Sequence, residues 1–356
     1  MTSVSDPLSR TSRQENVKKY YGDVLNTSDD LATDACATIE ETPPHLARAF
    51  KNIHPEVSAR YYGCGLVAPS GLLGAKVLDL GCGAGRDVYA LAQLVGPSGH
   101  VTGVDMTPEQ LEVARRHQDW HKQRFGFNET NVTFMDGDIE RLDALELGEG
   151  VFDVIVSNCV INLCSDKNAV FSNAFRLLKP GGEMYFADVY ADRRLPPEAR
   201  NDDRAHGECL AGALFWEDFI GAAQEAGFRD PRLVTHRALA INDEALKDLL
   251  APATFQSATY RLIKSASSPS EPARAKQVTY LGSHKESAEE FRLDKDNIFK
   301  AHQPTLVSSD TAHLIKYARW SDAFTIMEAD GCGAPPSRSP FDGRDEGTPV
   351  GTGCCG

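Results

Sequence analysis

A glycine-rich turn after residue 80 constrains the fold of this chain more than any other feature of its sequence. Lys76 to Leu80 have the pattern of a short buried strand, and glycines then occupy every second position, at Gly81, Gly83 and Gly85. The helical pattern that follows has apolar side chains on one face, at Val88, Leu91, Ala92 and Val95. A strand, a glycine turn and a helix in this order are typical of the nucleotide-binding start of a doubly wound α/β fold.

The spacing of the turn separates two classes of nucleotide-binding protein. A dinucleotide fingerprint requires its last glycine at the position where this chain has Arg86, and here a carboxylate, Asp79, stands two residues before the first glycine instead. The pattern D-x-G-x-G-x-G resembles the first motif of class I S-adenosylmethionine (SAM) methyltransferases. That resemblance implies SAM as the cofactor, with Asp79 and the three glycines against its methionine part.

Later motifs follow in the order that this fold requires. A second predicted strand ends at Asp105, where an acid that binds ribose hydroxyls belongs, and Met106 follows it. Asp138 and Ile139 come after a third strand and match the adenine contacts of the family. A fourth strand ends at Asn158, and a Leu-Lys-Pro-Gly-Gly turn precedes the fifth. Asp105 and Asp138 could also be ordinary strand-end caps, but the motif order favours cofactor binding by Asp79, Gly81, Gly83, Gly85, Asp105, Met106, Asp138, Ile139 and Asn158.

The sequence predicts an α/β fold, a class I SAM-methyltransferase doubly wound sheet with two additions. Residues 1–14 are expected to be disordered, and 15–69 to form an N-terminal lid over the nucleotide site. The core is predicted at 70–235 and a small C-terminal α+β domain at 236–330. Residues 331–356 are predicted to be a flexible tail that contains Cys354 and Cys355.

Composition excludes several other functions. The 356 residues carry a net charge of -14 without a cluster of Lys and Arg, which argues against a nucleic-acid partner. The sequence has neither an apolar run of about 18 residues nor an apolar segment after the first methionine, so no membrane span or secretory signal is expected. We therefore expect a cytoplasmic protein whose nine cysteines are mostly reduced thiols. Separately, we expect the protein to be a monomer.

Cysteines occupy three segments that can reach the transferred methyl group. Cys159 follows the fourth strand, Cys209 lies in a loop after the fifth, and Cys64 lies in the predicted lid, with Cys36 upstream. Open α/β sheets bind substrates at the carboxyl ends of their strands. Three thiolates suit a soft three-coordinate centre such as As(III), whose lone pair could attack the methyl carbon of SAM. Such a nucleophile has no proton to lose, so no general base is essential.

With these residues in place, the chain is similar to the arsenite methyltransferase family from about residue 15 to 328. The most specific blocks are Asn158-Cys159-Val160-Ile161-Asn162-Leu163 and Glu208-Cys209-Leu210-Ala211-Gly212-Ala213. Further matches are Asp34-Ala35-Cys36, Tyr61-Tyr62-Gly63-Cys64-Gly65, the glycine turn, Ala275 to Gly282, and Phe291-Arg292-Leu293-Asp294.

This resemblance implies an arsenite methyltransferase that binds its substrate through Cys64, Cys159 and Cys209. Cys64 would be needed most for the first methylation, and Cys36 would pair with it as a disulfide during turnover, to be reduced again by glutathione or thioredoxin. The substrate would be arsenite or its glutathione conjugate, methylated in steps to mono-, di- or trimethylated arsenic in a detoxification reaction.

Other interpretations remain open from the sequence. Cys82 and Cys164 are expected to be packing residues, because buried cysteine is a common small hydrophobe. Zinc binding by the thiols is an alternative, although the chain lacks a C-x-x-C pair. The protein could instead methylate an organic acceptor, with structural cysteines, or be a metalloid-binding thiol protein that has lost catalysis. The intact glycine turn and Asp105 argue against that loss.

Overall fold

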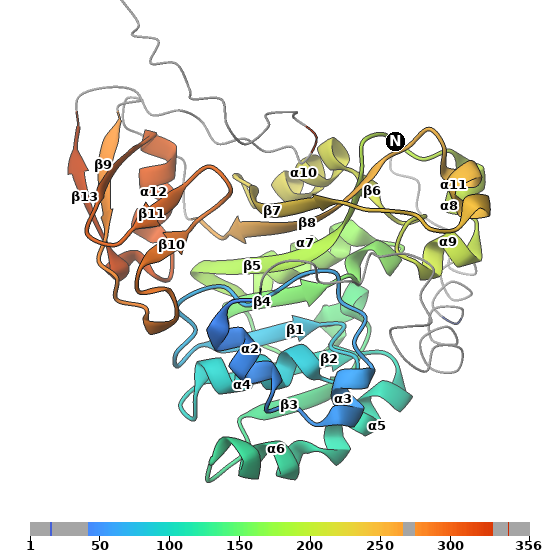
Figure 1. Ribbon diagram of the computed structural model, residues 1–356, viewed down its shortest axis with the longest axis horizontal. Coiled ribbons are helices and arrows are strands. Elements are labelled where there is room, and N and C mark those ends of the chain that lie inside the picture. The colour runs from blue at the N-terminus through green and yellow to red at the C-terminus, as the bar shows by residue number, and fades with distance from the viewer. Residues whose placement is uncertain (1–14, 16–41, 266–274, 330–340, 342–356) are drawn as a thin grey trace, which may run out of the picture.

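The computed structural model describes residue 15, residues 42–265, residues 275–329 and residue 341. Its centre is an eight-stranded sheet in the order β3-β2-β1-β4-β5-β8-β7, with the short β6 paired to β5 (Figure 1). The strands are β1 (Lys76–Leu80), β2 (His100–Asp105), β3 (Val132–Asp136), β4 (Phe152–Asn158), β5 (Leu178–Ala191), β6 (Leu214–Phe215), β7 (Arg232–Ala238) and β8 (Phe255–Ile263). β8 runs antiparallel to β5 and β7, and the other pairs are parallel.

Helices cover both faces of the sheet, so alternate residues of the central strands enter different cores. Val154 and Val156 of β4 pack in one core with α4 (Arg86–Val95) and α5 (Pro108–Arg116). Ile155 packs in the other with α7 (Lys167–Leu177) and α10 (Trp216–Glu225). This burial on both faces explains the continuous β-branched run of β4. The methyltransferase-like doubly wound sheet predicted from the sequence is confirmed.

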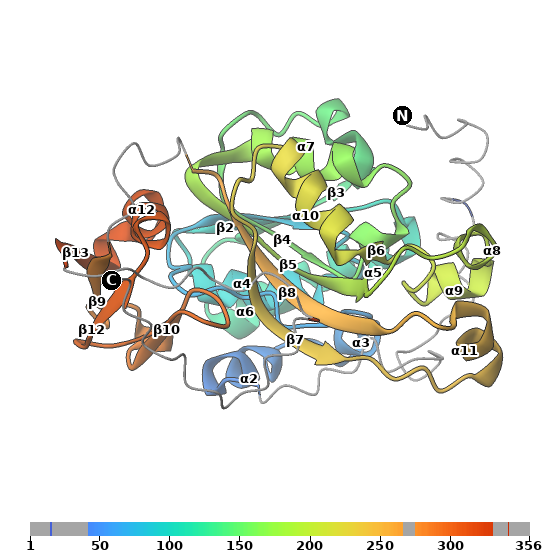
Figure 2. The same ribbon diagram turned by 90° about the horizontal axis from the view of Figure 1, so that it is seen from above.

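Short helices complete the layers around the sheet. The N-terminal segment forms α2 (Pro44–Phe50) and α3 (Pro55–Ala59), which lie on the side opposite α7 and α10 (Figure 2). The remaining helices of the core are α6 (Gln118–Phe125), η3 (Ile139–Ala144), η4 (Ile161–Leu163), α8 (Pro197–Arg200), α9 (Asp203–Gly207) and α11 (Glu244–Leu250). Within the part of the chain that the structure describes, no helix has the length and apolar character needed to cross a bilayer.

A C-terminal unit with its own core lies beside the main sheet (Figures 1 and 2). It comprises the three-stranded sheet β12-β9-β13 and the hairpin β10-β11, packed with α12. Its elements are β9 (Lys276–Tyr280), η5 (Lys285–Ser287), β10 (Glu290–Arg292), β11 (Ile298–Lys300), β12 (Pro304–Val307), α12 (Ser309–Tyr317), η6 (Ser321–Ala323) and β13 (Phe324–Glu328). An α+β appendage was expected here, and the described residues form one.

The predicted boundary of the C-terminal domain at residue 236 differs from the structure. β7 crosses this boundary, and β8 lies between β5 and β7 in the main sheet. These strands bury Tyr260 and Leu262 in the core beneath α10, so they cannot belong to a separate unit. The pattern of short strands indicated their type but not their sheet, because an antiparallel partner can come from anywhere along the chain.

Buried ion pairs attach the C-terminal unit to the core. Glu183 of β5 is fully buried between two guanidinium groups, with Arg261 Nε at 2.9 Å and Arg319 Nη2 at 2.6 Å. Arg319 also donates hydrogen bonds to the carbonyl oxygens of Ser70 and Gly71, just before β1. One residue of the C-terminal unit therefore fixes both the sheet and the connection from the N-terminal segment.

Candidate active site

A cavity of about 990 Å³, including open solvent at its mouth, lies at the carboxyl ends of β1, β2 and β4. Residues 60–63 of the N-terminal segment form part of its wall. Eight of the nine residues predicted to bind the cofactor line it: Asp79, Gly81, Gly83, Asp105, Met106, Asp138, Ile139 and Asn158. Gly85, the ninth, does not line the cavity.

The three glycines of the turn have left-handed φ angles, but they serve different purposes. A Cβ at Gly81 would lie 2.5 Å from Val160, and one at Gly85 would lie 2.8 Å from the ring of Phe134. Those two glycines allow close packing within the protein. A Cβ at Gly83 would meet no protein atom within 4 Å and would enter the space of the cavity. Gly83 is therefore the position where the backbone is bare toward a ligand.

Three buried carboxyl groups line the cavity, those of Asp79, Asp87 and Asp105. Burial raises the pKa of Asp79, Asp87 and Asp105 above the usual range, and Asp87 and Asp105 raise that of Asp79 further. Asp105 also accepts hydrogen bonds from the amides of Gly83 and Thr107, each at 2.8 Å. SAM carries an ammonium and a sulfonium group, so the residues present fit the predicted cofactor.

Asp138 and Ile139 lie on the wall of the same cavity, at the end of the loop after β3. The carboxylate of Asp138 accepts the amide hydrogen of Glu140 at 2.8 Å and thus caps η3. This cap fixes one oxygen of the carboxylate, and its neighbour Ile139 adds an apolar surface next to it. Asp138 therefore has the capping role that the sequence left open, at the start of η3. It also lies, with Ile139, in the wall of the cavity.

Cys159 and Cys209 both have left-handed backbones, with φ angles of 60° and 61°. Cys159 directly follows β4, and its amide donates to the carbonyl of Ala187 on β5 at 2.8 Å. The thiol of Cys209 donates to the carbonyl of Cys159, with 3.3 Å between Sγ and O. Such φ values are uncommon outside glycine and asparagine, and they persist where the surroundings fix the backbone. Both residues are almost completely buried, and Cys159 lines the cavity.

The loops that contain these two cysteines interlock. Asn162 donates from Nδ2 to the carbonyls of Val189 at 2.6 Å and Cys209 at 3.3 Å. Gly212 packs against Asn162 so closely that a Cβ would collide with the carbonyl oxygen of Asn162. The two most specific sequence blocks therefore contact each other directly.

Cys64 reaches the same region from the N-terminal segment. Its amide donates to Asn158 Oδ1 at 2.8 Å, and its carbonyl accepts from Ser257 Oγ at 3.0 Å. Cys64 and Cys159 both raise the pKa of the buried Tyr190 hydroxyl, after the larger effect of burial and that of Asp188 and Tyr260. The structure thus brings Cys64, Cys159 and Cys209 to one end of the sheet, while Cys36, Cys354 and Cys355 lie outside the described residues. Each of the five described cysteines is an unbridged thiol.

Cys82 and Cys164 are also buried, and both touch the cavity wall. Burial raises the pKa of both thiols well above the usual range, and nearby carboxylates raise it further. A thiol in such surroundings stays protonated and is a weak nucleophile or ligand. These properties agree with the packing role expected from the sequence.

Sequence reasoning missed the roles of Arg86 and Asp87. The guanidinium of Arg86 lies 3.6 Å from the ring centroid of Tyr61 and 4.0 Å from that of Phe50, and so holds the N-terminal segment against α4. The carboxylate of Asp87 accepts from Asn158 Nδ2 at 2.8 Å. The sequence does indicate their position, because Arg86 and Asp87 directly follow the last glycine of the turn and are the first two residues of α4, beside the cavity.

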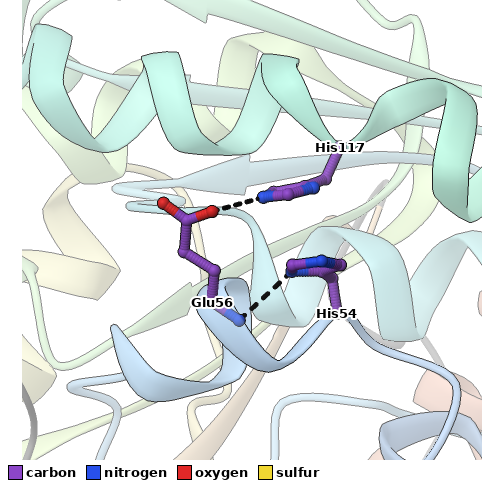
Figure 3. A group of neighbouring side chains, drawn as sticks. All are labelled: His54, Glu56 and His117. Atoms are coloured by element: carbon purple, nitrogen blue, oxygen red, sulfur yellow. Dashed lines mark hydrogen bonds and ion pairs between the residues drawn. The ribbon is translucent and has the colours of Figure 1, made fainter.

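A second group of possible metal ligands joins the N-terminal segment to the core (Figure 3). His54, Glu56 and His117 place ligand atoms within 4.8 Å of one another. The rings of His54 and His117, however, are stacked 3.7 Å apart at 18°, so their lone pairs run nearly parallel instead of converging on one point. His54 Nδ1 already accepts the amide hydrogen of Glu56, and Glu56 pairs with His117 at 2.7 Å. This geometry is that of a clasp between α3 and α5, not of a metal site.

Comparisons with known proteins found two matching family models and several similar proteins. Residues 73–236 match the family model described as a methyltransferase domain, and residues 273–355 match the arsenite methyltransferase C-terminal domain. An arsenite methyltransferase of Aquipseudomonas alcaligenes is 49% identical over 96% of this chain and 99% of its own length. The human arsenite methyltransferase is 44% identical over 88% and 83%.

A solved structure gives the same result. The crystal structure of an arsenic(III) S-adenosylmethionine methyltransferase from Chlamydomonas reinhardtii is 41% identical to this chain. It superposes with a TM-score of 0.77 and covers 83% of this chain and 100% of its own. The similarity therefore extends over most of the chain and beyond the methyltransferase domain alone.

Proposed function

The chain belongs to the arsenite methyltransferase family, and we propose on that basis that it methylates trivalent arsenic with SAM at the cavity and cysteines described above. One observation carries the proposal. Cys159 and Cys209 are held in left-handed backbones at the end of the sheet, with Cys159 in the wall of a cavity that suits a cationic cofactor. An organic acceptor would not require this arrangement of thiols.

The chain's own residues would hold the cofactor in the following way. Asp79 and Asp87 would offer buried carboxylates to its ammonium group, and Gly83 would allow close approach of the backbone. Gly81, which also lines the cavity, and Gly85 would let the turn pack against Val160 and Phe134. Asp105 and Met106 would bind the ribose, and Asp138 and Ile139 would bind the adenine. Asn158 would border the methionine end, and all five residues line the cavity. When bound, SAM supplies an electrophilic methyl group.

Cys64, Cys159 and Cys209 would bind the substrate. Each thiol that replaces a hydroxide of arsenite forms one S–As bond and releases one water, so the exchange needs no net proton acceptor. The arsenic keeps its lone pair, which the buried thiols hold toward the cavity. The exposed fractions of these cysteines are 2–3%, so the bound arsenic would be shielded from water.

The reaction also requires electrons. Arsenic formally loses two electrons when it takes a methyl cation, and two thiols that close a disulfide can return them. We assign this role to Cys36 with Cys64, followed by reduction with glutathione or thioredoxin. Repetition would give monomethylated and then di- or trimethylated products. Arsenite or its glutathione conjugate would serve as substrate, and we place this detoxification in the cytoplasm with a monomeric enzyme.

The test is an incubation of the purified protein with SAM, arsenite and glutathione, with Cys159→Ser in parallel and arsenic species separated by chromatography. We expect methylated arsenic from the parent protein and none from the variant. If the parent binds SAM but yields no methylated arsenic, the proposal fails, and a screen of organic acceptors would follow. Arsenite binding without turnover would indicate the metalloid-binding alternative.

A further inference from the structure

The side-chain amide of Asn158 holds the loop that contains Cys64. Its Oδ1 accepts the amide hydrogens of Cys64 at 2.8 Å and Gly65 at 3.2 Å, and its Nδ2 lies 3.0 Å from the carbonyl of Gly65. The side chain thus pairs with the main chain of Gly65 through a donor and an acceptor, as a neighbouring strand would. Nδ2 also lies 2.9 Å from Tyr61 Oη and 2.8 Å from Asp87 Oδ2.

The surrounding residues fit an asparagine and little else. An aspartate would place a second oxygen against the carbonyl of Gly65 and the carboxylate of Asp87. From the other side, a Cβ at Gly63 would collide with Asn158 Nδ2 and with the hydroxyl of Tyr61. A Cβ at Gly65 would lie 2.6 Å from Ala187 Cβ. The contact between residue 158 and the loop therefore requires the amide group of Asn158. It also requires that Gly63 and Gly65 have no side chain.

The other two thiols are fixed by different contacts. The amide of Cys159 donates to the carbonyl of Ala187 on β5. The thiol of Cys209 donates to the carbonyl of Cys159, and the carbonyl of Cys209 accepts from Asn162 Nδ2. None of these hydrogen bonds uses the side chain of Asn158. Loss of that side chain would therefore remove the hydrogen bond that fixes the amide of Cys64, while Ser257 would still bind its carbonyl, and it would leave the first two thiols in place.

From this asymmetry, and resting on the proposed function, we infer that Asn158 is a positioning residue that sets the third thiol of the arsenic site. It thereby determines whether the protein binds arsenic through three sulfurs or two. Arsenite can form three S–As bonds, whereas an arsenical that already has one carbon substituent can form only two. Asn158 thus favours the unsubstituted substrate over the substituted one.

The test compares arsenite with phenylarsine oxide, which can take only two thiols, by equilibrium dialysis on the full chain. In Asn158→Ala we expect arsenite affinity to fall by about tenfold, the weight of one or two lost hydrogen bonds, and phenylarsine oxide affinity to change by less than about threefold. X-ray absorption should then show arsenite bound by two sulfurs and one oxygen in the variant, against three sulfurs in the parent protein. Cys64→Ser supplies the reference spectrum for a site without the third thiol.

A second variant reaches the same contact from the loop. Gly63→Ala keeps Asn158 but displaces its amide, and it should produce the same selective loss of arsenite affinity. Thermal unfolding of each variant separates a local effect from a folding defect. Equal losses for both arsenicals, or three sulfurs around arsenic in a folded Asn158→Ala, would overturn the inference. If the parent protein itself fails to bind arsenite through sulfur, the proposed function fails instead.

Discussion

The thiol of Cys209 donates a hydrogen bond to the main-chain carbonyl of Cys159, 3.3 Å away, and both residues have φ angles near 60°. A residue with a Cβ in the left-handed region is strained by about 1–2 kcal/mol relative to its preferred conformation. Two such residues are in contact at the carboxyl end of one sheet. Their strained backbones lower the stability of the fold, and they place the two sulfur atoms where they are.

This strain leads to a prediction about glycine. Cys209→Gly should be more stable than Cys209→Ala by about 1 kcal/mol, because glycine adopts a φ of 61° without penalty. Neither variant should methylate arsenite if Cys209 is a ligand. Urea unfolding of the two variants measures the difference in stability, and product chromatography measures activity. A glycine variant less stable than the alanine variant would show that the Cβ of residue 209 contributes more through packing than it costs in strain.

Substitution at the glycine turn should separate the two ligands. Gly83→Val should abolish SAM binding and leave arsenite binding largely intact, because its Cβ would meet no protein atom within 4 Å and its branches would occupy the cavity. The left-handed φ of residue 83 also strains valine, so some loss of stability is expected. Isothermal titration with each ligand measures both. Gly85→Ala is the matched control, since its Cβ would meet Phe134 and should reduce stability more than it alters contacts in the cavity. Loss of both affinities in Gly83→Val would reveal a folding defect.

Much of the cavity that we propose as the cofactor site could be predicted, because the sequence motifs that form it are local. The glycine turn, Asp105 and the Asp138-Ile139 pair each occupy a few consecutive residues after a strand, and the parallel sheet brings strand ends together without further information. Gly85 shows the limit of such reasoning. It belongs to the same motif, yet it supports helix packing and does not line the cavity.

The details of the thiol site depend on contacts between distant segments. Cysteine has no preference for the left-handed region, so the φ angles of Cys159 and Cys209 result from tertiary packing. Asn158 was expected to bind the cofactor, and it does line the cavity, but most of its hydrogen bonds go to a loop more than 90 residues earlier. The position of β8 between β5 and β7 also depends on contacts between distant segments. For this reason the domain boundary in the structure differs from the one expected from the sequence.

The interlock between the two cysteine loops should be sensitive to a single methyl group. Gly212→Ala would place a Cβ against the carbonyl oxygen of Asn162, and relief of that collision would break the hydrogen bond from Asn162 to Cys209. We expect the free energy of unfolding to fall by about 2 kcal/mol or more. The affinity for phenylarsine oxide should fall by a larger proportion than the free energy of unfolding does. Gly221→Ala is a suitable control, because a Cβ there meets nothing within 4 Å. Unchanged affinity for phenylarsine oxide in Gly212→Ala would show that the loops hold Cys209 without this contact.

The attachment of the N-terminal segment to the core should weaken in acid. His121 Nδ1 donates to the carbonyl of His117 at 2.8 Å, and its Nε2 accepts the amide hydrogen of His54 at 3.1 Å, so the neutral ring uses both nitrogens. Burial, together with the neighbouring His117 and His54, lowers the pKa of His121 to about 4.

Because the folded protein disfavours the charged ring, His121 contributes stability in full above its ordinary pKa of 6.5, and this contribution is lost as the pH falls from 6.5 toward 4. The parent protein should therefore lose about 1–2 kcal/mol more between pH 7.5 and pH 5 than His121→Gln, a figure discounted for partial solvation of the ring. Urea unfolding of both proteins at the two pH values measures it. Histidines that do not contact His121 contribute equally to both proteins, so they cancel in the comparison. If the two proteins lose stability equally, His121 has the same pKa folded and unfolded, and its hydrogen bond to the amide of His54 does not attach the segment.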